Sequence, residues 1–267
     1  DRVGMSRQNY YKQRKVSRRR QVDEELVVAL VARERRQQPR IGGRKLHGLL
    51  SEELAEVGVE IGRDCFFEVL RNHDMLVKPL PPASHRTTNS RHSLPVFQNL
   101  IRNLEPTGPD QIWVSDITYI RTLEGFEYLT LIMDLYSRKI VGYQCGENLD
   151  AASNLVALNR AIQDLPENRF PIHHSDRGCQ YCCHEYVEVL QGRSLPVSMT
   201  EENHCYENAY AERLNGILKQ ELGLGWTLNT RKQARRAVSQ AVWVYNNRRP
   251  HGSLNNQMPA RVHTKAA

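Results

Sequence analysis

The chain has 267 residues, 40% hydrophobic and 25% charged, which suits one large globular domain or two smaller ones. It has no run of about 18 apolar residues, and its first twenty residues lack the apolar stretch of a secretory signal, so neither a transmembrane helix nor such a signal is expected in it. The net charge is +7, and the whole excess lies in residues 1–105, where 20 Lys and Arg stand against 13 Asp and Glu, while residues 106–267 hold 17 of each.

The basic first part of the chain favours a polyanionic partner, most simply nucleic acid, although a solvated basic surface would have the same composition. Residues 1–78 are predicted to be helical, since apolar positions recur at helical spacing in segments 22–37, 44–57 and 62–74. Gly58 is the predicted C-cap of the second helix. Short helices with a tight turn are compatible with a helix-turn-helix, and equally with a small helical bundle that binds no DNA.

Residues 79–109 are rich in proline and in Ser, Thr and Asn, which predicts a linker or an extended basic arm. The six cysteines of the chain, two of them adjacent, form no disulfide framework pattern. This usage indicates a reducing cytoplasm.

Residues 110–225 change in character and predict an α/β domain with a mixed sheet and flanking helices, followed by a C-terminal helix and tail in 226–267. Three β-rich runs in close succession predict antiparallel strands, and helix and strand then alternate. The expected strands are 111–122, 126–137, 139–146, 170–176 and 195–199, and the expected helices are 152–165, 184–191, 208–222 and 231–246.

Three carboxylates stand out by their positions in these elements. Asp116 lies inside the apolar strand IWVSDITYI, where an acid is costly unless it is paired, hydrogen-bonded or bound to a metal. Asp176 ends the short strand FPIHHSD, and strand ends are where α/β sheets usually build their sites. Glu212 lies on helix 208–222, where Asn208, Asn215 and Lys219 fall within about 60° of it and the apolar residues face the other way.

Two kinds of chemistry fit such carboxylates. Hard divalent cations take oxygen ligands, and two of them about 4 Å apart can hold the attacking and leaving oxygens of a phosphodiester displacement. A glycosidase also uses two carboxylates, but it needs an aromatic sugar cleft, which 7% aromatic residues and a basic arm do not favour. Asp134 also lies on a predicted strand, and a structural hydrogen-bonding role is the preferred interpretation for it.

The stretch HHSDRGCQYCCH around Asp176 raises zinc as an alternative, because Cys179 and Cys182 have acceptable spacing. A structural zinc site usually needs two separated pairs of ligands, and the candidates here crowd into a single turn. The preferred ligand in this stretch is therefore Asp176, with His174 and Arg177 as candidate neighbours of a bound phosphate.

Five stretches of the chain stand out: WVSDITYI (113–120), YLTLIMDLYSRKIVGY (128–143), HSDRGCQY (174–181), ENAYAERLNGILKQEL (207–222) and YNNRRPHGSLNNQMPA (245–260). Taken together, they resemble the second-frame (OrfB) transposases of the insertion-sequence-three family, whose catalytic core is shared with retroviral integrases. Asp176 and Glu212 have 35 residues between them, the interval typical of the D,D-35-E signature of that family. Upstream, IGGRKLHGLL resembles the family's helix-turn-helix, which makes Arg44 and Lys45 candidate DNA contacts.

The resemblance implies a ribonuclease H-like fold in which the first and fourth strands are neighbours and the acid-bearing helix packs beside them. Asp116, Asp176 and Glu212 would then bind two Mg²⁺ or Mn²⁺ ions as the catalytic residues. Lys219 would contact the end of the element's DNA, and Asn208, Asn215 and Arg177 are further candidate contacts. The implied reaction is hydrolysis at an element's 3′ end, followed by attack of the freed 3′-hydroxyl on another phosphodiester.

The implied partners are double-stranded DNA, as terminal inverted repeats and as target, and a second copy of the chain, because two DNA ends must be held at once. No membrane partner is expected. The chain starts at Asp1 without Met, which fits a fragment or a product fused to an upstream-frame OrfA partner. A DNA-binding regulator that keeps the fold without the chemistry remains the alternative function. Cys179, Cys182 and Cys183 stand where the family often has Ser or Thr, which indicates packing positions rather than ligands.

Overall fold

The computed structural model describes residues 6–78, 93–201 and 209–266. The chain divides into two compact units, Asp1–Leu80 and Pro81–Ala267, and each has a hydrophobic core of its own. Within these described ranges, no helix has the length and apolar character needed to cross a membrane.

The first unit consists, in its described part, of helices whose apolar faces meet in one core. The first helix begins well before the predicted segment, and the Ser6 hydroxyl caps it by accepting a hydrogen bond from the Asn9 backbone N–H at 3.2 Å. The second helix ends at Glu56 with Val57 as its C-cap, so the predicted cap residue Gly58 lies one position later, where its φ of 78° suits glycine. The helices are α1 (Arg7–Arg35), α2 (Gly43–Glu56) and α3 (Arg63–Asn72).

The second unit contains a five-stranded mixed sheet, which confirms the predicted architecture. Its strand order is β3-β2-β1-β4-β5; β1 pairs antiparallel with β2 and β2 with β3, while β4 runs parallel to β1 and β5 parallel to β4. The first and fourth strands are thus neighbours. The strands are β1 (Ile112–Thr122), β2 (Gly125–Asp134), β3 (Ile140–Gly146), β4 (Ile172–Ser175) and β5 (Val197–Met199).

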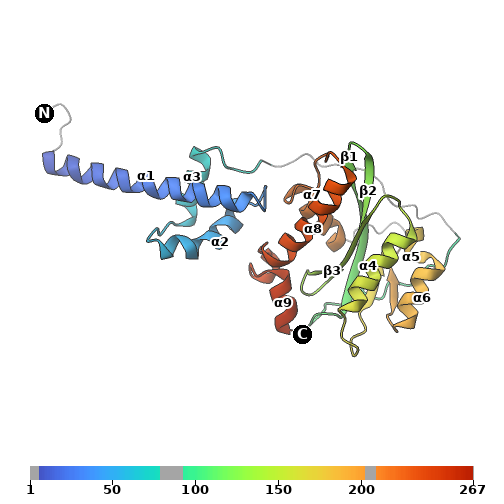
Figure 1. The fold of residues 1–267 in the computed structure, drawn as a ribbon. Coiled ribbons are helices and arrows are strands. Elements are labelled where there is room, and N and C mark those ends of the chain that lie inside the picture. Colours follow the sequence, from blue (N-terminus) through green and yellow to red (C-terminus); the bar gives the residue numbers. More distant parts are fainter. Residues whose placement is uncertain (1–5, 79–92, 202–208, 267) are drawn as a thin grey trace. The chain divides into compact units, whose positions relative to one another are not determined.

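Helices cover both faces of this sheet (Figure 1). Because side chains alternate along a strand, Trp113 and Ile117 of β1 enter the core under α4 and α6, while Val114 and Ile120 enter the core under α7 and α8. A short helix, α5, follows β4. The helices are α4 (Ala151–Gln163), α5 (Cys179–Cys182), α6 (His184–Gly192), α7 (Ala209–Gln220) and α8 (Arg231–Asn247).

Polar side chains hold the end of α8 to β3, and the segment after α8 to the residue that follows α7. Asn246 pairs with the backbone of Ile140, accepting from its N–H and donating to its carbonyl at 2.9 Å each, so the side chain acts as an added strand residue. Arg249, only 2% exposed, binds both carboxylate oxygens of Glu221 at 2.8 and 2.9 Å. The segment contains the 3-10 helix η2 (Gly252–Leu254) and the helix α9 (Pro259–Ala266).

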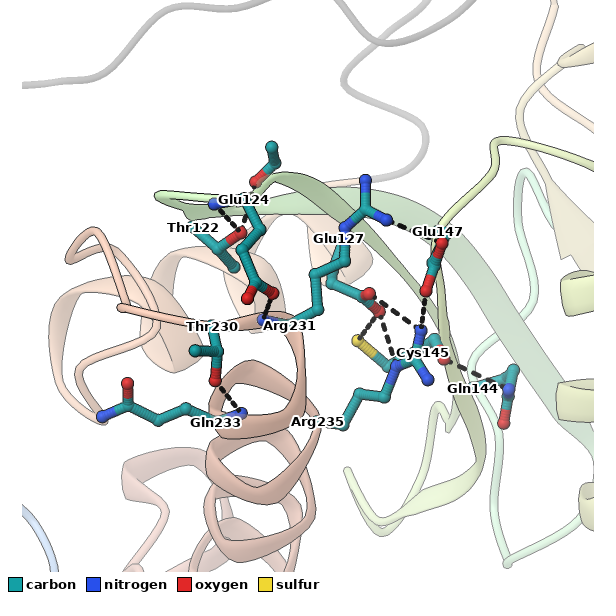
Figure 2. A network of polar contacts seen from close by, with 11 residues as sticks. Thr122, Glu124, Glu127, Gln144, Cys145, Glu147, Thr230, Arg231, Gln233 and Arg235 are labelled. Atoms are coloured by element: carbon teal, nitrogen blue, oxygen red, sulfur yellow. Dashed lines mark hydrogen bonds and ion pairs between the residues drawn. The ribbon is translucent and has the colours of Figure 1, made fainter.

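A polar network ties the start of α8 to the β1–β2 hairpin and to the end of β3 (Figure 2). Glu127 is 0% exposed and accepts two hydrogen bonds from the guanidinium of Arg235, at 3.0 and 3.1 Å, and one from the Cys145 thiol at 3.3 Å. Arg235 and Arg231 also bind Glu147, at 2.9 and 2.6 Å. Because an unpaired buried carboxylate is costly, Arg235 fixes the position of α8 on the sheet.

Candidate active site

Two of the three predicted carboxylates lie at neighbouring strand positions. In the parallel pairing of β1 with β4, Val114 lies opposite His174. The same register carried two residues further sets Asp116 opposite Asp176, which directly follows the last residue of β4. Since neighbouring strands lie about 4.8 Å apart, the two carboxylates lie where side chains from adjacent strands converge.

Helix α7 brings two further polar side chains to the same place. Glu212 lies in its first turn and is exposed, and Asn215 donates from Nδ2 to Oδ2 of Asp116 at 2.6 Å. On the opposite face of α7, Leu214 is buried in the core, which fixes the rotation of the helix. Asn208, which the sequence sets on the same polar stripe, lies outside the described residues.

The pKa of Asp116 is raised by burial and by the two neighbouring acids. Its pKa rises from 3.8 to about 8, first because the carboxyl is buried and next because Asp176 and then Glu212 bring negative charge near it. The backbone N–H of Ile117 and the amide of Asn215 lower that pKa by donating hydrogen bonds. Asp176 and Glu212 therefore lie near enough to Asp116 to oppose the ionisation of its carboxyl.

This donor set fits a hard divalent cation, because all three candidate ligands offer carboxylate oxygens and a cation would relieve their repulsion. Oδ1 of Asn215 is buried with no hydrogen-bond partner among the described residues, so a further oxygen acceptor stands beside Asp116. The ligand oxygens of Asp116, Asp176 and Glu212 do not all lie within 4.8 Å of one another. Over the described ranges, the group of His, Cys, Asp or Glu whose ligand atoms all lie within 4.8 Å of one another is Asp110, Asp134 and His263.

That second cluster is bound into the fold by hydrogen bonds. Asp134 is 0% exposed and accepts from the Asp110 N–H at 2.8 Å, the Ser137 N–H at 2.7 Å and the Ser137 hydroxyl at 2.6 Å. His263 of α9 lies between the two acids, 3.6 Å from Asp110 and 3.7 Å from Asp134. Both carboxylate oxygens of Asp134 are already used, which supports the structural interpretation of this residue.

Lys219 lies two turns after Glu212 and is half-buried. Its Nζ stands 4.2 Å from the centroid of the Tyr119 ring. Burial lowers the pKa of its ammonium, Asp116 raises it and Arg121 lowers it, so a cation lies within electrostatic range of the carboxylates. Sequence reasoning missed Tyr119, because alternation along β1 sets its side chain on the face opposite to Asp116 and does not reveal its contact with Lys219 of α7.

The other predicted contacts have different surroundings. Arg177 donates from Nε to the Thr200 carbonyl at 2.7 Å. His174 is 0% exposed, with Nδ1 2.9 Å from the Ser198 hydroxyl. The prediction that His174 neighbours a bound phosphate is therefore wrong, because its ring is enclosed by the core.

In the first unit, Arg44 and Lys45 lie in the first turn of α2, where Arg44 is exposed and Lys45 half-buried.

The Cys- and His-rich stretch forms no zinc site among its described residues. His173 is buried with Nε2 2.9 Å from the Tyr186 hydroxyl, and burial lowers the pKa of its imidazole to about 3. Cys182 is buried with its Sγ 3.6 Å from the Met199 sulfur, and Cys183 reaches the Gln180 carbonyl. These side chains form the packed layer behind the strand end that carries the aspartate.

Comparison with known proteins places the second unit in a recognised group. Residues 106–205 match a family model described as "Integrase core domain", and residues 193–259 match a second family model with the same description.

Two curated relatives align over nearly the whole chain. The "Insertion element IS600 uncharacterized 31 kDa protein" of Shigella sonnei is 36% identical over 266 residues, covering 98% of this chain and 96% of that protein. "Transposase InsF for insertion sequence IS3A" of Escherichia coli (strain K12) is 30% identical over 256 residues, covering 94% and 86%.

Among solved structures, a chain of the "simian T-cell lymphotropic virus intasome in complex with PP2A regulatory subunit B56 gamma" is similar, with a TM-score of 0.51 and 19% identity. The match covers 83% of this chain and 74% of that chain, and it bears on the fold alone.

Proposed function

The chain belongs to the insertion-sequence-three family of transposases with an integrase core, and on that premise we propose that it cuts the ends of an insertion sequence and joins the freed 3′-hydroxyl to DNA by two-metal-ion phosphoryl transfer. It is a polynucleotidyl transferase that acts on DNA, and its second unit has the ribonuclease H-like fold of integrase cores. The observation that carries the proposal is the pairing of β1 with β4, which sets Asp116 beside Asp176; the hydrogen bond from Asn215 of α7 and the raised pKa of Asp116 support it.

In the proposed site, Asp116, Asp176 and Glu212 hold Mg²⁺ or Mn²⁺. When bound, two such ions polarise the phosphodiester and stabilise the oxygens that attack and leave. Asp116 is the inner ligand, because it is flanked by both other acids, and Asn215 orients its carboxylate through the 2.6 Å hydrogen bond. Glu212 is exposed in the first turn of α7 and adds negative charge near Asp116.

Cationic groups around the carboxylates bind the DNA in this proposal. Lys219 lies beside the site and supplies a positive charge to a phosphate of the element's end. Arg177, held by Thr200, supplies a second charge next to Asp176. Arg44 and Lys45 contact duplex DNA from the first unit, which belongs to the basic part of the chain.

The proposed reaction requires that two DNA ends be held together, so the active form is at least a dimer of this chain on paired ends. The similar viral structure is described as an intasome, which supports an assembly on DNA. An upstream-frame OrfA protein is the further partner we propose.

Substitution of each carboxylate tests the proposal. Asp116→Asn, Asp176→Asn and Glu212→Gln should each abolish Mg²⁺-dependent end cleavage and strand transfer while leaving DNA affinity nearly unchanged. The matched control is Asp134→Asn, scored per folded molecule, which should retain transfer because Asp134 serves the fold. Transfer that persists in any one of the three variants would remove that residue from the site. DNA binding by a wild-type chain that transfers no strand would instead identify a regulator that keeps the fold.

A further inference from the structure

The outer half of the β1–β2 hairpin carries aromatic and cationic side chains on one face. The pairing sets Tyr119 opposite Tyr128 and Arg121 opposite Phe126, and alternation along the strands places all four on the same side. Tyr128 packs against the core, whereas Arg121 is exposed and Phe126 is 48% exposed. An aromatic ring thus stands half in solvent beyond the covered part of the sheet.

These side chains touch one another and a residue of α7. The rings of Tyr119 and Phe126 meet edge to face, with centroids 5.4 Å apart and planes at 84°. Nζ of Lys219 lies 4.2 Å from the Tyr119 centroid, and the guanidinium carbon of Arg121 lies 6.0 Å from it. The fold therefore gathers two cations around one aromatic ring.

Lys219 connects the group to the carboxylates, because it follows Asn215 by one turn of α7 and its ammonium lies within electrostatic range of Asp116. Tyr119 follows Asp116 by three residues on β1, a strand length of about 10 Å, so its side chain leaves the opposite face of the strand. A span of this size corresponds to the neighbouring nucleotide rather than to the phosphate that is cut. Nucleic acid alternates an anionic phosphate with a flat base, and paired cations and aromatic rings are the side chains that bind such a strand.

We propose that Phe126, Tyr119, Arg121 and Lys219 form a binding surface for the nucleotide that adjoins the cleaved phosphate, with its base stacked on Phe126 and its phosphates bound by Lys219 and Arg121. This surface rests on the proposed function, because it assigns the path of the same DNA strand. Tyr119 is a positioning residue: it braces Phe126 at its edge and holds the Lys219 ammonium over its face.

A fluorescent base tests the stacking. The probe is a duplex with an unpaired terminal nucleotide whose base is aminopurine, mixed with the full chain in chelator so that binding is read without cleavage. Binding should quench the fluorescence with the wild type and with Phe126→Trp, but not with Phe126→Leu. Phe126→Leu should weaken affinity by about 5- to 150-fold, the range for loss of one stacked base. Leu123→Ala, at the 77% exposed hairpin tip, is the matched control and should change neither readout.

An abasic version of the same probe separates stacking from a structural role of Phe126. Removal of the base should weaken binding to the wild type and have no further effect on Phe126→Leu, since both changes delete one contact. The proposed surface would be refuted if the affinity losses from the abasic probe and from Phe126→Leu multiply. Quenching that persists in Phe126→Leu would refute it as well. If Phe126→Leu melts at a lower temperature, the wild type with the two probes still decides: equal affinity for both refutes the stacking.

The same experiments distinguish the two proposals. Quenching that depends on Phe126 in a chain that cuts no DNA in Mg²⁺ would support the surface and refute the proposed reaction. If cleavage depends on the carboxylates but Phe126→Leu changes neither the quenching nor the affinity of the probe, the surface alone is refuted.

Discussion

At the scale of single residues, Asp116 links protonation, stability and cation binding. An unfolded aspartate loses its proton near 3.8, whereas the folded Asp116 carboxyl keeps its proton to about 8. The native state therefore binds more protons than the unfolded state between these values, and this contribution to the free energy of unfolding is lost as pH rises through the window.

The first prediction concerns that window. In chelator, the melting temperature of the wild type should fall as pH rises from about 4 to 8. The melting temperature of Asp116→Asn should fall less over this range, because the amide has no proton to lose. Addition of Mg²⁺ at neutral pH should release a proton from the wild type and not from Asp116→Asn. Weakly buffered calorimetry measures this release. Equal release from both proteins would assign the proton to another group.

A second prediction concerns Asn215, whose amide bonds Asp116 directly. Asn215→Ala removes the donor that orients the carboxylate and should raise the Mg²⁺ concentration needed for half-maximal cleavage by about 10- to 100-fold. Gln220→Ala, an exposed change at the end of the same helix, is the control. An unchanged Mg²⁺ titration for Asn215→Ala would show that Asp116 is oriented without it.

At the scale of elements, a buried charge adds to the apolar packing of α8 on the sheet. Glu127 is fully enclosed, and its carboxylate oxygens are held by Arg235, which is itself half-exposed. The pair fixes the helix because removing the cation leaves the buried carboxylate with only the Cys145 thiol among its described donors.

The third prediction follows from this pair. Arg235→Ala should lower the free energy of unfolding by about 2–3 kcal/mol, below the full cost of breaking a buried pair because Arg235 is partly solvated. Its neighbour Arg236 is exposed and lines the same hollow as Arg235 and Glu147. Arg236→Ala should therefore change the free energy of unfolding by no more than about 0.5 kcal/mol. Urea denaturation gives both values.

A second substitution supplies the check on the mechanism. Glu127→Gln added to Arg235→Ala should recover part of the loss, because the uncompensated buried charge is gone. If the loss of unfolding free energy in the double variant equals the sum of the losses in Arg235→Ala and in Glu127→Gln, burial of an unpaired charge is not the cause.

At the scale of the whole molecule, charge is divided between the first and later parts of the chain. Residues 1–105 carry a net +7 and the remainder is neutral. The proposed DNA contacts of α2 lie in the basic part, whereas the proposed chemistry lies in the neutral part. Affinity and catalysis should therefore respond to different substitutions.

The fourth prediction tests this division through salt. The logarithm of DNA affinity should fall linearly with the logarithm of salt concentration, and Arg44→Gln with Lys45→Gln should reduce the slope by about 2. Arg33→Gln is the control, because this guanidinium already binds Glu53 at 2.6 Å. A slope unchanged by the α2 substitutions would move the phosphate contacts elsewhere, while a flat dependence would refute phosphate binding by the basic part.

The sequence by itself determined the strands, most of the helices and the three candidate carboxylates. The periodicity of apolar residues is a local property of the sequence. IWVSDITYI therefore predicts a strand, and the stripe on helix 208–222 predicts a polar face, wherever these elements pack in the fold. The spacing of Asp176 and Glu212 likewise needs no structure to be read.

Only the tertiary structure decided which side chains meet. Asn215 bonds Asp116, Lys219 covers Tyr119 and His263 lies between two buried acids, although each pair is about a hundred residues or more apart in the chain. Such contacts depend on the register of β1 with β4 and on the rotation of α7, which buried residues across the whole core set together. For the same reason His174, which looked available beside Asp176, is enclosed. Periodicity reports the face on which a side chain lies, and only packing reports what covers that face.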